Sequence, residues 1–139
     1  MLKTAITLFA VSSLSACSSI PEHISLHQQT LIPCPATPNC ISSATQGPWL
    51  MASSADWQQI LSFLGGLEYT ELGIHDADYA HFVVTSRIMH FKDDVELQRS
   101  ADGIEYRSAS RTGYSDFGVN QKRMQLWKKM LIEQKLLQP

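Results

Sequence analysis

The densest group of reactive side chains in this sequence lies between Arg107 and Arg123. This segment runs from a predicted strand, through a glycine-containing turn, onto a predicted helix, whose unpaired N–H groups and dipole favour an anion. Guanidinium groups suit carboxylate or phosphate because their donors form a planar fork. The segment therefore predicts a binding site for an anionic ligand. Its candidate residues are Glu96, Arg107, Ser108, Ser110, Arg111, Asp116, Asn120 and Arg123.

An internal network is the alternative interpretation of the same side chains. In that case Arg107 pairs with Glu96, Arg111 pairs with Asp116 or Asp93, and the other polar groups satisfy the turn. One structural feature separates the two hypotheses. A ligand site needs a concave pocket on which the polar groups converge, whereas a network fills that space.

Catalytic chemistry has weaker support in the sequence. His75, His81 and His90 lie in the predicted sheet region, but no G-x-S-x-G segment marks a nucleophilic serine. We expect these histidines to be partly exposed to solvent. Asp93-Asp94 lies in a predicted tight turn, where carboxylates are solvated and give no acid–base pair with separated pKa values. The sequence therefore identifies no catalytic residue, and an enzyme is the less favoured interpretation.

The segment from His75 to His81 contains two histidines and two aspartates, which are ligand types that metals accept. Asp76 and Asp78 are also typical of the turn that precedes a strand. We therefore expect a turn here, with both histidines solvated, and we expect no metal and no cofactor.

A short amphipathic helix is predicted to position the start of the domain. Ser53 and Ser54 can cap it, with Asp56 in its first turn. Gly65-Gly66 would end it, since glycine accepts the left-handed C-cap conformation. Its apolar face comprises Trp57, Ile60, Leu61 and Leu64, at helical spacing.

Four strands are predicted after this helix from alternating apolar and polar residues. They cover about residues 69–74, 79–88, 95–99 and 104–110. Asp102-Gly103 is a hairpin-turn dipeptide. If Arg99 lies opposite Ile104, then Glu96 lies opposite Arg107, and one hairpin face carries an ion pair.

A second helix is predicted from Ser115, its cap, with Asp116 in the first turn. Its buried face would comprise Phe117, Asn120, Met124, Trp127 and Leu131, widened by Val119, Leu126 and Met130. The order helix, strands, helix predicts an α+β fold with two layers, in which a roughly four-stranded antiparallel sheet packs with two helices.

The first residues of the chain are typical of an exported protein. Lys3 and a short apolar run precede Leu14-Ser15-Ala16-Cys17, which resembles the lipobox of bacterial lipoproteins. The resemblance implies that residues 1–16 are a removed signal peptide and that Cys17 carries fatty acyl chains such as palmitate. The alternative is an ordinary secretory peptide cut nearby. Residues 17–32 would then form a tether, and residues 33–139 one globular α+β domain.

Localisation follows from the same resemblance. Ser18 stands where an aspartate would signal retention at the inner membrane, so we expect an outer-membrane lipoprotein that faces the periplasm. In this interpretation the domain is a binding or structural module held on the membrane, with an anionic envelope ligand as a candidate partner. The alternative is an envelope enzyme that acts on glycan or lipid.

The charge balance excludes one class of partner. The mature chain, residues 17–139, has ten basic and thirteen acidic side chains, a formal net charge of −3, which does not fit a nucleic-acid binder. The basic residues gather in the last third of the chain. They would either pair with the acidic part of the same domain or form a patch facing anionic lipid or glycan.

Three cysteines are an odd number for an exported protein. With Cys17 lipidated, Cys34 and Cys40 remain as a pair, and an oxidising compartment permits a disulfide between them. Their spacing differs from the C-x-x-C redox motif. We therefore predict a structural disulfide.

Three separated blocks carry a resemblance to a known family: C-P-A-T-P-N-C-I-S-S from Cys34, F-K-D-D-V-E-L from Phe91, and Y-R-S-A-S-R-T-G-Y-S-D-F-G-V-N-Q-K-R from Tyr106. In this order they resemble the domain of unknown function 1499, over about residues 33–130. The resemblance implies no established activity. The signature residues that it implies are Cys34, Asn39, Cys40, Asp94, Glu96, Arg107, Ser108, Ser110, Arg111, Asp116, Asn120 and Arg123.

Overall fold

The computed structural model describes residues 24–25 and 30–139 of the chain. The predicted signal peptide, Cys17 and most of the predicted tether lie outside these residues. Within the described part of the chain, no helix is both long enough and apolar enough to cross a membrane.

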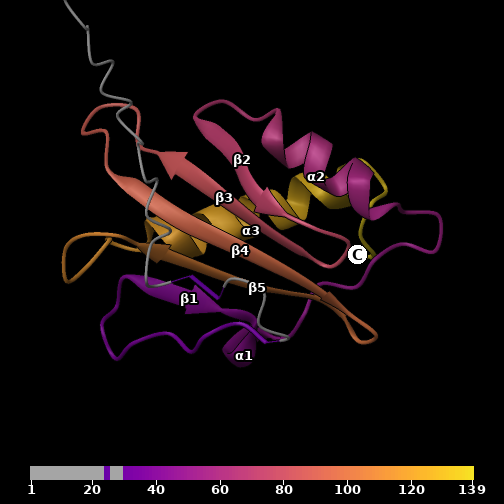
Figure 1. Cartoon of the computed structure of the whole chain (residues 1–139), viewed down its shortest axis with the longest axis horizontal. Helices are drawn as coiled ribbons and strands as arrows, with labels where there is room; N and C mark the ends of the chain where they lie inside the picture. Colours follow the sequence, from indigo (N-terminus) through magenta and orange to yellow (C-terminus); the bar gives the residue numbers. More distant parts are fainter. Residues whose placement is uncertain (1–23, 26–29) are drawn as a thin grey trace, which may run out of the picture.

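Five antiparallel strands form one sheet, in the order β1-β5-β4-β3-β2 (Figure 1). The strands are β1 (Cys40–Ser42), β2 (Thr70–His75), β3 (Tyr79–Thr85), β4 (Lys92–Ser100) and β5 (Gly103–Ser110). The prediction of four strands missed β1. This strand is three residues long and follows a segment rich in proline and cysteine, so it has no alternation to reveal it.

Three helices accompany the sheet: α1 (Ser43–Gln46), α2 (Trp57–Gly65) and α3 (Val119–Glu133). The side chains of α2 and α3 form one apolar core with the sheet, and the rings of Phe82 and Trp127 meet edge to face at 5.5 Å. The predicted α+β class is confirmed. The predicted order of helix, strands and helix was incomplete, because β1 and α1 precede α2.

The β4–β5 hairpin has the predicted register. Arg99 lies opposite Ile104, and Glu96 opposite Arg107. The turn needs Gly103 for two reasons: its φ is +133°, and a Cβ atom there would lie 2.5 Å from the carbonyl oxygen of Trp49. The Asp-Gly pair therefore fixes which side chains share a face of the sheet.

The two long helices begin later than the sequence indicated. Asp56, rather than Ser53 or Ser54, caps α2, because its carboxylate accepts from the backbone N–H of Gln58 while Gln59 reaches back to the N–H of Asp56. The predicted apolar face of α2 is buried as expected. The final helix begins at Val119, four residues after the predicted cap Ser115.

The late start of α3 changes which side chains its buried face contains. Asn120, Met124, Trp127 and Leu131 are buried as predicted. Phe117 precedes the helix and is exposed, and Val119 and Leu126 are also exposed. The apolar face of α3 is therefore narrower than predicted.

A disulfide links Cys34 to Cys40, with 5.6 Å between their Cα atoms. This confirms the predicted pairing. The linkage closes the loop that leads into β1, the edge strand beside β5.

Candidate functional site

Strand β4 presents three buried carboxylates to opposite faces of the sheet. Alternation directs Asp93 toward the helices, and directs Asp94 and Glu96 toward the other face, which we call the polar face. The predicted turn at Lys92-Asp93-Asp94 was wrong, since β4 begins at Lys92 and both aspartates pair with valines of β3. These acids are buried because each one has a guanidinium partner.

Asp94 lies between Arg111 and His81 on the polar face. Its carboxylate accepts two hydrogen bonds from Arg111, at 2.8 and 2.9 Å, and lies 2.7 Å from Nε2 of His81. Burial alone would raise the pKa of Asp94, but the hydrogen bonds from His81 and Arg111, together with their charges, hold that pKa well below its usual range. The carboxyl is therefore ionised and fully buried.

Glu96 is the second carboxylate of the polar face. Its oxygens accept from the Tyr79 hydroxyl at 2.8 Å, from the Arg107 guanidinium at 3.1 Å and from the backbone N–H of Ser25. Burial, and then the charge of Glu96, raise the pKa of the Tyr79 hydroxyl far above its usual value. The phenol therefore stays protonated and donates a hydrogen bond to Glu96. The ion pair expected between Arg107 and Glu96 is confirmed.

A second network lies on the helix-covered face, at the start of α3. Arg123 pairs with Asp93 at 2.5 Å and also donates to the side-chain oxygen of Asn120. The Asn120 amide in turn donates to Asp116 and to Ser110, at 2.7 and 3.0 Å. This network attaches α3 to the sheet by charge-assisted hydrogen bonds.

The loop before β1 joins this second network. The carbonyl of Asn39 accepts from the Ser110 backbone at 3.0 Å and from the Asn120 amide at 3.3 Å, while its own amide donates to the carbonyl of Gly113 at 2.7 Å. Asn39 directly precedes Cys40 and its disulfide. The three sequence blocks thus meet at Asn39, Asp93 and Asn120.

Most of the described residues match one family. The chain matches the model of the family described as protein of unknown function DUF1499 over residues 30–131. The chain belongs to this family. No curated protein and no solved structure matches it.

The sheet of this DUF1499 domain divides the eight predicted site residues into two groups. Glu96, Arg107 and Arg111 lie with the polar-face network. The other five belong to the network at the start of α3: Ser108, Ser110, Asp116, Asn120 and Arg123. These residues therefore do not converge on one site.

Four further residues of the networks were missed or misread from the sequence. His81 was expected to be solvated, but it is buried against Asp94, and Tyr79 donates to Glu96. Asp93 and Asp94 were placed in a turn. The alternation of β3, which puts Tyr79, His81 and Val83 on one face, is the signal that could have placed Tyr79 and His81 together.

The expected turn around Asp76 is present. Its carboxylate accepts from the backbone N–H groups of Asp78 and Tyr79, at 2.9 and 2.8 Å, so it serves the turn before β3. His75 lies against the carbonyl of Gly73, and His81 lies with Asp94. Among the described residues, no group of three or more histidine, cysteine, aspartate or glutamate side chains is placed to hold a metal ion.

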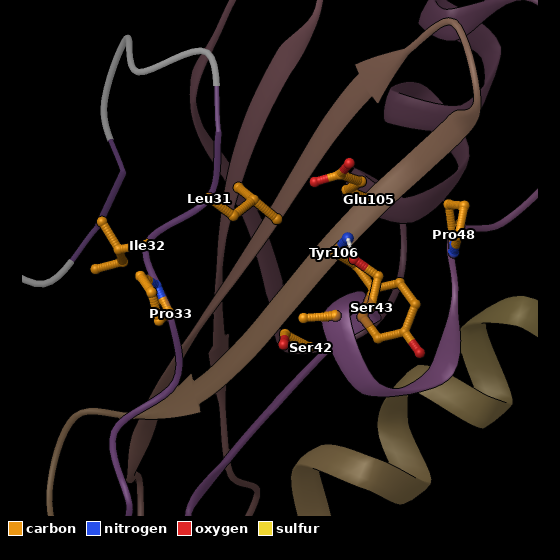
Figure 2. Close-up of a pocket in the computed structure, with 9 residues that line it drawn as sticks. Leu31, Ile32, Pro33, Ser42, Ser43, Pro48, Glu105 and Tyr106 are labelled. Carbon is orange, nitrogen blue, oxygen red and sulfur yellow. Dashed lines mark hydrogen bonds between the residues drawn. The ribbon is translucent and has the colours of Figure 1, made fainter.

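The N-terminal segment covers part of the polar face. Ile24 and Ser25 are buried, and the Ser25 hydroxyl accepts from the backbone N–H of Ile32. A pocket of about 290 Å³ lies beside this segment (Figure 2), where Leu31 points toward β5. Its lining residues are Leu31, Ile32, Pro33, Ser42, Ser43, Ala44, Pro48, Glu105 and Tyr106. None of the eight predicted site residues lines this pocket.

Proposed function

We propose that this DUF1499 chain is a lipid-anchored protein of the bacterial cell envelope and that its domain is a binding or structural module. Cys17 would carry the lipid, and the outer membrane, facing the periplasm, is the expected location. The lipobox-like residues Leu14–Cys17 support the anchor. The Cys34–Cys40 disulfide supports export, because disulfides persist in oxidising compartments.

One observation favours a binding or structural module over an enzyme. Each guanidinium of the predicted anion site lies against its own carboxylate: Arg107 against Glu96, Arg111 against Asp94, and Arg123 against Asp93. An anionic ligand would have to displace a buried carboxylate at each position. The block therefore serves best as the internal framework of the domain.

The enzyme alternative has less support from the same geometry. A general acid or base must come within hydrogen-bond reach of its substrate. Asp94, Glu96 and His81 are buried beneath neighbouring residues, and hydrogen bonds from His81 and Arg111 hold Asp94 ionised. These groups stabilise one another in the folded chain.

The lipid anchor is tested by labelling. The chain is expressed in a diderm bacterium with radioactive palmitate, and its membrane fraction is floated on a density gradient. We expect the wild-type chain to incorporate label and float with membranes, and the Cys17→Ser chain to do neither. If the wild-type chain were exported without incorporating label and stayed out of the membrane fraction, the proposed lipid anchor would be wrong. The chain would then be an ordinary secretory protein.

A further inference from the structure

Exposed apolar side chains gather at one end of the sheet, which we call the loop end. It consists of the β3–β4 loop (residues 86–91), the β5–α3 loop (residues 111–118) and the residues beside them. Of nine large apolar side chains exposed among the described residues, seven lie here: Tyr69, Ile88, Met89, Phe91, Tyr114, Phe117 and Val119. Leu50 and Leu126 lie elsewhere. Isolated exposed apolar residues are normal, but this concentration indicates a contact surface.

Hydrogen bonds between strand ends show that these segments share one end of the sheet. The backbone N–H of Arg111 donates to the carbonyl of Lys92 at 3.1 Å, which joins the two loops. The N–H of Thr85 donates to the carbonyl of Tyr69 at 2.9 Å. Figure 1 shows both loops on the left, opposite the β4–β5 hairpin.

The β3–β4 loop is built so that its apolar tip points away from the domain. The hydroxyl of Ser86 accepts from the backbone N–H of Phe91, and the carbonyl of Ser86 accepts from the N–H of His90. Between these contacts Ile88 and Met89 are 83 % and 65 % exposed. On the neighbouring loop, Phe117 is 89 % exposed.

Cationic side chains flank this apolar tip. Arg87 and Lys92 lie on either side of it and are exposed, and Lys122 is exposed on the first turn of α3. Two acidic side chains also lie at the loop end. Glu68 is next to Tyr69 on the β2 side, and Asp116 lies in the β5–α3 loop, where its carboxylate accepts from the backbone N–H groups of Gly118 and Asn120. Aromatic and aliphatic side chains bordered by lysine and arginine match the interface of an anionic lipid bilayer.

The docked N-terminal segment limits the distance between the domain and the membrane. Ser25 is held at Glu96, near the middle of β4, and it stands only eight positions after Cys17 in the sequence. Eight residues reach at most about 29 Å when fully extended. From Glu96 to Lys92 at the loop end is only about 13 Å along the strand. A lipid on Cys17 thus brings the domain near the bilayer, and the apolar side chains select which end meets it.

We propose that the loop end is a membrane-contacting surface, whose apolar residues insert into the interfacial region of an anionic bilayer. This inference rests on the proposed lipid anchor. An anionic bilayer is the partner of the loop end for two reasons. The lipid anchor would hold the loop end within reach of the bilayer, and the cationic side chains that border the loop end complement the anionic headgroups.

The test places a reporter on the loop end of a chain that is attached to vesicles by a different anchor. The mature Cys17→Ser chain carries an N-terminal polyhistidine tag and binds vesicles of phosphatidylglycerol with nickel-chelating lipid. With Cys34 and Cys40 in their disulfide, an introduced cysteine is the one reactive thiol. An environment-sensitive dye is attached in Ile88→Cys, in Phe117→Cys and, as the control at the opposite end, in Leu50→Cys.

We expect a several-fold rise in dye emission on vesicle binding for Ile88→Cys and Phe117→Cys, and little change for Leu50→Cys. Equal emission changes in all three variants would overturn the proposal. A rise that depends on protein concentration without vesicles would also overturn it, because the occupant would then be a second copy of the chain. The tag replaces the lipid, so this result is independent of whether Cys17 is lipidated in cells.

Discussion

The partners of Asp94 determine how this buried acid behaves. In the folded chain it lies among His81, Arg111 and the neighbouring strands, and its pKa is lower than the ordinary value of 3.8 that it has when unfolded. Folding is therefore favoured while the carboxyl is ionised. This contribution is fully present above the ordinary pKa and is lost as the pH falls below it.

Replacing Asp94 by asparagine should lower the free energy of unfolding at neutral pH and should make that free energy fall less steeply as the pH is lowered. Asp94→Asn leaves Arg111 and His81 without their carboxylate, so we expect a loss of about 3 kcal/mol in the free energy of unfolding at pH 7. Arg111 is partly exposed, which places this value at the lower end for a broken buried pair. Urea unfolding at pH 7 and at about pH 2.5, below the ordinary pKa of the carboxyl, measures both effects.

The pH dependence should shrink in Asp94→Asn without disappearing, because the pKa of Asp116 is also lowered. Burial alone would raise it, but hydrogen bonds from the backbone of Asn120 and Gly118 outweigh burial. Glu133→Gln, at an exposed pair on α3, is the matched control and should cost less than about 0.5 kcal/mol. An Asp94→Asn chain as stable as wild type at pH 7 would disprove the ion-pair role.

At the scale of elements, the start of α3 depends on backbone conformation more than on side-chain capping. Gly118 stands at the N-cap with a φ of +78°, and Asp116 accepts from the backbone N–H groups of Gly118 and Asn120. A Cβ atom at Gly118 would meet nothing within 4 Å, so only backbone strain opposes a side chain there.

Substitutions of Gly118 should therefore follow the cost of the left-handed conformation. We expect Gly118→Ala to lower the free energy of unfolding by about 1 kcal/mol. Gly118→Asn should cost less, because asparagine tolerates that conformation. Thermal unfolding of the two variants measures the order, and an alanine variant as stable as the asparagine variant would refute the strain argument.

The elements also show how far the sequence can be interpreted. The apolar stripe of α2 and the register of the β4–β5 hairpin were predictable, because periodicity and the Asp102-Gly103 turn act locally. The late start of α3 was not, because Ser115 and Asp116 are good caps, and the sequence does not reveal that both Phe117 and Gly118 have a positive φ, at 54° and 78°. The two aspartates of β4 resemble a turn unless their distant partners Arg111 and Arg123 are known.

At the scale of the whole molecule, both faces of the sheet are covered, each in a different way. The helices cover the apolar face, and residues 24–25 with the segment from residue 30 lie at the polar face, where Ser25 donates to Glu96. The sequence around Ser25 has no periodicity, so its burial could not be predicted. Only the assembled sheet shows that one sequence block supplies two separate networks.

We claim that these networks are an internal framework, and a double-mutant cycle on Glu96 and Arg107 measures the energetic coupling that such a framework requires. Both side chains are buried on the polar face. Glu96→Gln and Arg107→Met should each lower the free energy of unfolding by about 3–5 kcal/mol, since each leaves a buried charge without its partner. The double variant should lose less than the sum, with a coupling of at least about 1 kcal/mol. Single variants within about 0.5 kcal/mol of wild type, with additive effects, would contradict the claim.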